Sequence, residues 1–224
     1  MPAVPAGATR PGPTVDPAVR RRRWLRLTGV LAGTAAASLR APVTGARGRR
    51  RLSVCAAARM LTAAGVRVRV VPSPVPWPRT GVGHGPGHLV VATSICWVDD
   101  LALRTVVTGL PVGSSATETR VAELLRAGQT VTVGSAGTAL LQAAVGAGAA
   151  ICPVVVRYRV DGEAGSAVAA SIAGATRWRS LARVVATRGL VVEVHLLPAL
   201  DPAGADREPV RPTPVRRRVP VRAA

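Results

Sequence analysis

The sequence contains no phenylalanine and no lysine, and only 2% of its 224 residues are aromatic. A core without Phe must be built from Val, Leu, Ile and Ala, whose small side chains pack closely but specify fewer contacts. Because Lys is absent, all 30 basic residues are Arg. The bias toward Ala, Arg, Gly and Pro is typical of a genome rich in G and C, so the use of Arg carries little functional information by itself.

Cysteine is also scarce, with Cys55, Cys96 and Cys152 as the three examples. Their odd number argues against a fully paired disulfide framework, and their spacing matches no metal site. We expect them to be small buried hydrophobic residues, which is compatible with a reducing cytoplasm. The sequence predicts no metal and no resident cofactor.

Acidic residues are few, since 11 Asp and Glu oppose 30 Arg and leave a net charge of +19. Such a charge favours a polyanionic partner, either phospholipid headgroups or nucleic acid. The basic runs at 20–23, 47–51 and 216–218 are solvated tails on one interpretation and contacts to an anionic membrane surface on the other. Nucleic-acid binding is disfavoured because the chain offers no aromatic platform and no recognised motif.

No apolar run is long enough to span a bilayer. Residues 24–39 fall short of the ~20 residues that a span requires, and they include Arg26. We therefore predict an interfacial or shallowly inserted helix, with Trp24 at the headgroup level and the arginines on the cytoplasmic side. A signal peptide is the competing interpretation, which the long Pro-rich leader before the basic run weakens.

The length predicts one main domain with tails. Periodicity predicts helices at 52–64, 97–107, 114–128, 138–145 and 177–188, and strands at 66–71, 89–92, 130–133, 151–160 and 189–197. Pro153 suggests that strand 151–160 lies at an edge or carries a bulge. Alternating helices and strands indicate an α/β fold with a mostly parallel sheet covered by helices. The predicted division is a disordered leader (1–19), a basic membrane-associating segment (20–51), an α/β domain (52–198) and a basic disordered tail (199–224).

The junction after strand 89–92 is the most informative stretch, because α/β folds place their chemistry where a strand meets a helix. There L-V-V-A-T-S-I-C-W-V-D-D-L-A-L resembles the first block of the glycerolipid acyltransferases of the lysophosphatidic-acid type, which carry N-H-x-x-W-x-D within an H-x-x-x-x-D motif. On that register Asp99 occupies the position of the family's aspartate. Ser94 occupies the position of its catalytic histidine.

The resemblance continues through the second half of the chain and covers roughly residues 52–198. The stretch V-T-V-G-S-A-G-T resembles the family's strand followed by F-P-E-G-T, with Gly137 and Thr138 matching and Ala136 replacing the acid. The stretches I-C-P-V-V-V-R-Y-R and G-L-V-V-E-V-H-L-L-P resemble the V-x-P-V block and the last strand of the actinobacterial branch. The G-x-x-F-x-x-R block that contacts the acceptor phosphate has no counterpart between Pro111 and Glu118.

The resemblance implies transfer of a fatty acyl group from acyl-CoA or acyl carrier protein, as co-substrate, to a lysophospholipid-type acceptor. The candidate catalytic residues are then Asp99 and Ser94, and the candidate substrate-binding residues are Gly137 and Thr138. A serine hydroxyl is not a base near pH 7, so its presence costs on the order of 10⁴-fold in rate by analogy with triad deletions. We expect an impaired acyltransferase at the cytoplasmic membrane face or, alternatively, a non-catalytic lipid- or membrane-binding pseudoenzyme, in which Asp99 caps a helix.

Other residues offer poor substitutes for the missing histidine. His88 lies about 20 Å from Ser94 along an extended strand, His84 falls in a glycine-rich loop, and His195 has the setting of an ordinary strand histidine. Ser94 lacks the flanking glycines of a nucleophile elbow. The G-S-A-G-T turn is either a phosphate cradle or, more simply, a tight connection from strand to helix, and it lacks the Lys of a P-loop.

Overall fold

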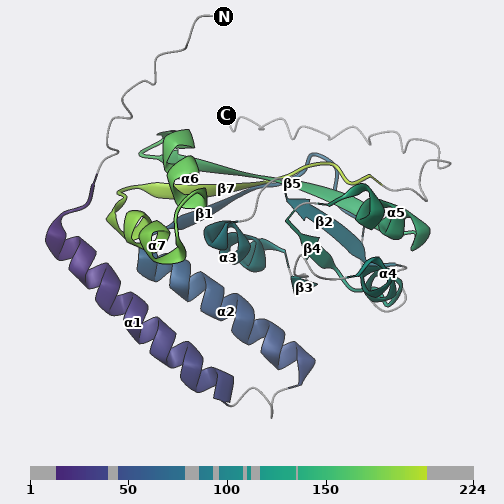
Figure 1. Ribbon diagram of the computed structural model, residues 1–224, viewed down its shortest axis with the longest axis horizontal. Coiled ribbons are helices and arrows are strands. Elements are labelled where there is room, and N and C mark those ends of the chain that lie inside the picture. Colours follow the sequence, from purple (N-terminus) through teal and green to yellow (C-terminus); the bar gives the residue numbers. More distant parts are fainter. Residues whose placement is uncertain are drawn as a thin grey trace, which may run out of the picture.

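The computed structural model describes residues 14–39, 45–78, 86–92, 96–107, 110–111, 117–134 and 136–200 (Figure 1). The helices are α1 (Pro17–Leu39), α2 (Ala46–Ala64), α3 (Trp97–Val106), α4 (Glu118–Arg126), α5 (Thr138–Gly146), α6 (Ser166–Ala173) and α7 (Arg177–Ala186). The strands are β1 (Arg67–Val71), β2 (His88–Ala92), β3 (Leu110–Pro111), β4 (Val131–Val133), β5 (Ala150–Val160), β6 (Glu163–Ala164) and β7 (Leu190–Leu196). Residues 1–13 of the predicted leader and 201–224 of the predicted tail lie outside the described residues, and the last residues of the leader begin α1.

The strands form one sheet in the order β1-β7-β5-β2-β4-β3, with β6 paired to β5. All pairs are parallel except those of β5 with β6 and with β7. A helix follows most strands and returns the chain for the next parallel strand, as the alternating pattern predicts. The predicted α/β fold with a mostly parallel, helix-covered sheet is therefore confirmed.

The sequence predicts that strand 151–160 lies at an edge or carries a bulge. The edge alternative was wrong, because β5 lies in the middle of this sheet, and its registers with β2 and β7 run without a break. Pro153 pairs in register with Val91 of β2, and the ladder between β5 and β7 ends at Val154. The Pro153 carbonyl accepts the Leu197 N–H at 3.1 Å, so the backbone polar groups of Pro153 point toward the chain that follows β7, just beyond the end of that ladder. At that position the missing N–H removes no bond between paired strands, which is why a central strand tolerates a proline.

The core consists of two apolar clusters on the two faces of the sheet. Successive side chains of β2 alternate between them, since Val90 belongs to the cluster that contains α3 and α7 residues and Leu89 to the cluster that contains α4 and α5 residues. Both β2 side chains are fully buried. Burial on both faces explains why β2 has a continuous apolar sequence rather than an alternating one.

Helices α1 and α2 lie side by side along one side of the sheet (Figure 1). Arg23 of α1 donates from Nη1 to the carbonyls of Val185 (2.9 Å) and Thr187 (2.8 Å), where α7 ends. Leu27 is buried, and the partly buried Trp24 packs against the core; its predicted place at the headgroup level stays a prediction. The first half of α1 is therefore part of the folded domain. None of the described helices is both long and apolar enough to cross a bilayer.

The structure departs from the predictions at one segment border and in one helix. The basic run 47–51 belongs to α2, so the predicted border between residues 51 and 52 falls inside a helix; the domain division itself stays a prediction. Helix α2 ends as predicted at Gly65, whose φ of 78° favours glycine. The sequence also gave no indication of α6, because its Ala-rich sequence S-A-V-A-A-S-I-A lacks a polar face that would reveal a helical period.

Candidate functional site

The predicted site lies where β2 ends at Ala92 and α3 begins at Trp97. Residues 93–95, and with them Ser94, lie outside the described residues. Asp99 is the third residue of α3, and its Oδ2 accepts the backbone N–H of Cys96 at 2.9 Å. This contact forms half of a capping box, with the Cys96 side chain completing it at the N-cap. Asp99 thus has a local structural role at the start of α3.

The other carboxylate oxygen of Asp99 accepts a hydrogen bond from the hydroxyl of Tyr158, the one tyrosine of the chain. Tyr158 comes from β5, and its Oη also lies 3.1 Å from the Sγ of Cys96. Asp99 is only 2% exposed. A buried carboxylate is stable only when its oxygens are hydrogen-bonded, and Tyr158 and Cys96 provide one donor for each oxygen.

Neither neighbour of Asp99 supplies a base near neutral pH. Burial raises the pKa of Tyr158 far above its usual range, and the Asp99 carboxylate raises it further, so the phenol stays neutral and donates to Asp99. Burial also raises the pKa of the Cys96 thiol; the hydrogen bond with Tyr158 acts in the opposite direction, but the net direction is upward. The cluster of Cys96, Asp99 and Tyr158 therefore holds no thiolate or phenolate near pH 7.

The two described histidines lie away from this cluster. His88 is the first residue of β2, and its ring packs edge-on against Trp77, with the ring centroids 6.3 Å apart. The rest of this extended strand, about 13 Å long, separates His88 from the junction. His195 lies on the other face of the sheet from Tyr158, because Tyr158 pairs in register with Val192, three positions before His195 in β7. Its Nε2 lies 3.4 Å from the Glu193 carboxylate. His84 falls outside the described residues.

Gly137 and Thr138 reach the same edge of the sheet as the start of α3. Strand β4 pairs parallel with β2, so both strands end at that edge. Gly137 is the N-cap of α5, and its carbonyl accepts the Leu140 N–H at 3.1 Å. Both residues are exposed, and within the described ranges no hydrogen bond or ion pair joins them to Asp99. Ala136, which replaces the family's acid, packs against the core instead.

Sequence reasoning missed Tyr158 as a member of the site. The alternation of β5 could have placed Tyr158 on one face of the sheet, but nothing in the sequence of β5 shows that the start of α3 packs on this face. The cysteine prediction holds for Cys152, which is buried, and is wrong for Cys55, which is exposed on α2. Over the ranges that the structure describes, no group of His, Cys, Asp and Glu side chains could hold a metal ion.

Comparison with known structures bears on the fold. The model superimposes on the crystal structure of the 1-acyl-sn-glycerophosphate (LPA) acyltransferase PlsC from Thermotoga maritima with a TM-score of 0.57 and 17% sequence identity. The match covers 85% of this chain and 88% of that one. The chain has a glycerolipid acyltransferase-like fold. No protein-family model matches the sequence, and no curated protein matches it either. Within this acyltransferase-like fold, Asp99 sits at a strand-to-helix junction, where α/β proteins concentrate their chemistry.

Proposed function

We propose that this protein is a lipid-associated member of the acyltransferase fold in which histidine-dependent acyl transfer is impaired. The observation that carries the proposal is the state of Asp99, whose two carboxylate oxygens accept hydrogen bonds from Tyr158 and from the Cys96 backbone in a buried setting. An aspartate that orients a catalytic histidine needs an oxygen for the imidazole N–H. Here each Asp99 oxygen already accepts one hydrogen bond, from the Tyr158 hydroxyl on one oxygen and from the Cys96 N–H on the other.

The chemistry of acyl transfer gives the same expectation. Moving an acyl group from an acyl-CoA or acyl-carrier-protein thioester to a hydroxyl requires a base for the hydroxyl proton, a group that orients this base, and donors for the tetrahedral oxyanion. Ser94 provides no base, and Ala136 provides no carboxylate. Binding and positioning of an acceptor by backbone groups would leave at most a small residual rate.

An acyl-transfer assay tests this proposal. The purified chain is incubated with oleoyl-CoA and vesicles that contain lysophosphatidate, and phosphatidate is measured by mass spectrometry. We expect no product above the protein-free reaction, and none for Ser94→His, because position 136 still lacks an acid and the buried Asp99 already accepts hydrogen bonds from Tyr158 and Cys96. The double variant Ser94→His/Tyr158→Phe supplies a histidine and also removes the Tyr158 hydrogen bond to Asp99. Its comparison with Ser94→His separates the effect of the missing base from the effect of that hydrogen bond. Turnover by the unaltered chain that disappears in Ser94→Ala would show that the site is active.

A second function, association with the cytoplasmic face of the membrane, is favoured by the surface of α1 and α2. The two helices enclose an open groove of about 900 Å³, in which Gly29 and Gly33 leave open space and Arg26 and Arg59 supply positive charge. Leu25 of α1 is 63% exposed. Apolar side chains beside arginines suit the boundary between lipid headgroups and acyl chains.

Vesicle sedimentation tests this association. We expect binding to vesicles of phosphatidylglycerol and phosphatidylcholine, and weaker binding for Leu25→Asp/Leu31→Asp, since a carboxylate in place of an exposed leucine opposes both insertion and attraction to anionic lipid. Val145→Asp, an equally exposed position on α5, is the matched control. Binding that neither requires phosphatidylglycerol nor responds to the α1 substitutions would contradict the proposal.

A further inference from the structure

Strand β1 is the long open edge of the sheet. It pairs with β7 on one side, and no described residue pairs with its other side. The opposite edge is formed by β3, which has only two residues. An unpaired edge presents backbone N–H and C=O groups that a further strand can bind.

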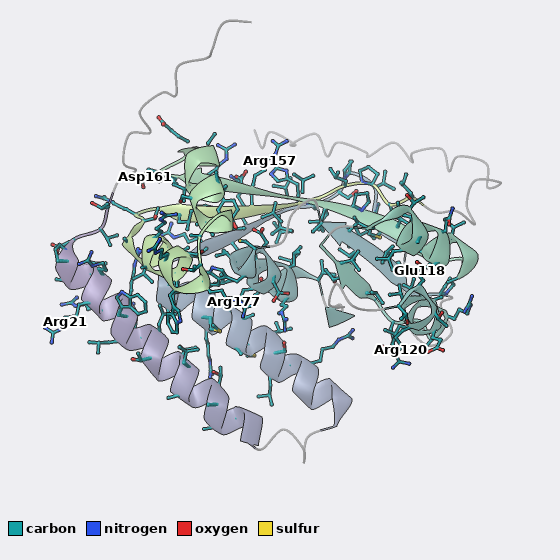
Figure 2. The ribbon with its side chains drawn as sticks, viewed as in Figure 1. Arg21, Glu118, Arg120, Arg157, Asp161 and Arg177 are labelled. Carbon is teal, nitrogen blue, oxygen red and sulfur yellow. The ribbon has the colours of Figure 1, made fainter. Side chains whose placement is uncertain are left out.

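Positive charge accumulates at this edge. Arg67 and Arg69 alternate along β1, and Arg69 lies in register with Glu193 of β7, which itself lies in register with Arg157 of β5 (Arg157 is labelled in Figure 2). Glu193 is buried and paired with Arg159 at 3.0 Å, while its contact with Arg69 is longer, at 3.5 Å. Glu193, the one acidic residue among these side chains, is thus shared between Arg69 and Arg159. The side chain of Arg69 remains 71% exposed.

A basic groove adjoins the first half of β1. It has a volume of about 770 Å³ and lies between α1, the end of α2 and β1, with Arg22, Arg26 and Arg67 among its lining residues. None of the described residues that line it is acidic. Arg23 also lines it but is already bound to carbonyls at the end of α7. The β1 edge therefore has arginines on the sheet face and more arginines in the groove beside it.

We propose that β1 binds an extended acidic segment of a partner protein by strand addition. Backbone hydrogen bonds to the open edge would supply affinity without regard to sequence, and Asp or Glu side chains opposite Arg67 and Arg69 would supply selectivity. Val70, between the arginine positions and the strand end, is 44% exposed and would pack against an aliphatic part of the added strand. The partner surface is recognised by its negative charge and its extended backbone.

Other occupants fit less well. A second copy pairing β1 against β1 would place arginines opposite arginines, which is destabilising. Residues 201–224 of the chain carry six Arg against three acidic residues, so their charge is of the wrong sign. Among the described residues that line the groove, none has an aromatic side chain on which a nucleic-acid base could stack. Lipid headgroups would meet the arginines but leave the backbone groups of the edge unpaired.

Fluorescence anisotropy with labelled ten-residue peptides tests the proposal on the full chain. The probe alternates Glu and Thr, and a second peptide has the same sequence with every other residue N-methylated, so that its charge is unchanged but one hydrogen-bonding edge is blocked. We expect the first peptide to bind the unaltered protein. The N-methylated peptide should bind that protein about tenfold or more weakly, and the variant Arg67→Glu/Arg69→Glu should bind the first peptide about tenfold or more weakly. The matched control Arg177→Glu/Arg179→Glu reverses two exposed charges on α7 and should leave affinity within about twofold.

The outcomes separate strand addition from general attraction to anions. Equal binding of the N-methylated peptide, or equal loss with the α7 control, would overturn the proposal. The proposal would also be overturned if the peptide failed to bind while phosphatidylglycerol vesicles or duplex DNA bound, and this binding required Arg67 and Arg69. Arg67→Gln/Arg69→Gln serves if the charge-reversed variant fails to fold, as judged by its thermal unfolding, and we expect it to weaken binding several-fold.

Discussion

The hydrogen bonds of Asp99 explain what this carboxylate does where β2 leads into α3. One oxygen caps α3 through the Cys96 N–H, and the other accepts from Tyr158 of β5. The side chain thus links the start of α3 to the C-terminal end of β5. Such a buried, fully bonded acid has a structural use that does not depend on a histidine.

Tyr158→Phe tests this structural role. Removing the hydroxyl leaves one oxygen of a buried carboxylate without its donor, so we expect a loss of about 1–3 kcal/mol in the free energy of unfolding, measured in urea. Arg120→Ala, which removes an exposed ion pair with Glu123, is the control and should change stability by less than about 0.5 kcal/mol. An unchanged stability for Tyr158→Phe would show that Asp99 does not depend on this bond.

The three cysteines should differ in reactivity. Burial raises the pKa of Cys152 to about 12, and burial also raises the pKa of Cys96, whereas Cys55 is exposed. Because the thiolate is the reactive form, we expect one fast-reacting thiol with Ellman's reagent at pH 8 in the native protein and three in urea. The fast phase should vanish in Cys55→Ser. Its persistence in that variant would show that Cys96 or Cys152 is accessible.

At the scale of elements, α1 is divided between a docked half and a half that borders the open groove. The docked half is held by Leu27, which is 3% exposed, and by Arg23 at the end of α7. A cation at a helix C-terminus meets the unpaired carbonyls and the negative end of the helix dipole. This contact attaches the first half of α1 to the end of α7.

Paired substitutions on α1 measure that docking. Leu27→Ala should destabilise the protein by about 2–4 kcal/mol because it opens a cavity in the core, whereas Leu25→Ala, two residues away and largely exposed, should cost less than about 1 kcal/mol. Chemical unfolding followed by circular dichroism gives both values. Similar small losses for the two variants would indicate that α1 is not docked in solution.

At the scale of the whole molecule, Glu193 of β7 links the two strands that flank β7, through ion pairs with Arg69 of β1 and Arg159 of β5. Burial acts to raise its pKa, but the contacts with Arg159, His195 and Arg69 outweigh burial and hold the pKa below its ordinary value of 4.5. A carboxyl group with a lowered pKa stabilises the fold above its unfolded-state pKa, and this contribution disappears as the pH falls through the folded-state value.

The pH dependence of Glu193→Gln follows from that direction. We expect the variant to melt at a lower temperature than the unaltered protein at pH 7, and the difference to shrink as the pH falls below about 4.5. Thermal unfolding at pH 7, 5 and 3 measures the difference. Glu123→Gln, in an exposed pair on α4, is the matched control. A difference that stays constant over this range would show that the ionised form of Glu193 is not what stabilises the fold.

The local signals in the sequence located most elements. Gly65 marks the end of α2, Thr117 caps α4 by accepting the Arg120 N–H, and the apolar run 89–92 gives the central strand β2. These features depend on residues close in sequence, so propensity and periodicity suffice to place them. The replacement of the expected histidine and acid by Ser94 and Ala136 was likewise evident from the sequence.

Only the tertiary structure decided which strands are central and what surrounds Asp99. Pro153 suggested an edge, but the ladder with β7 ends beside it and leaves β5 in the middle of the sheet. The Tyr158 hydroxyl meets Asp99 across 59 positions of sequence, and the arginines of β1 and β5 share Glu193 only through the register with β7. Local pattern fixes where helices and strands form, whereas long-range pairing selects which side chains meet, and no short stretch of sequence encodes that choice.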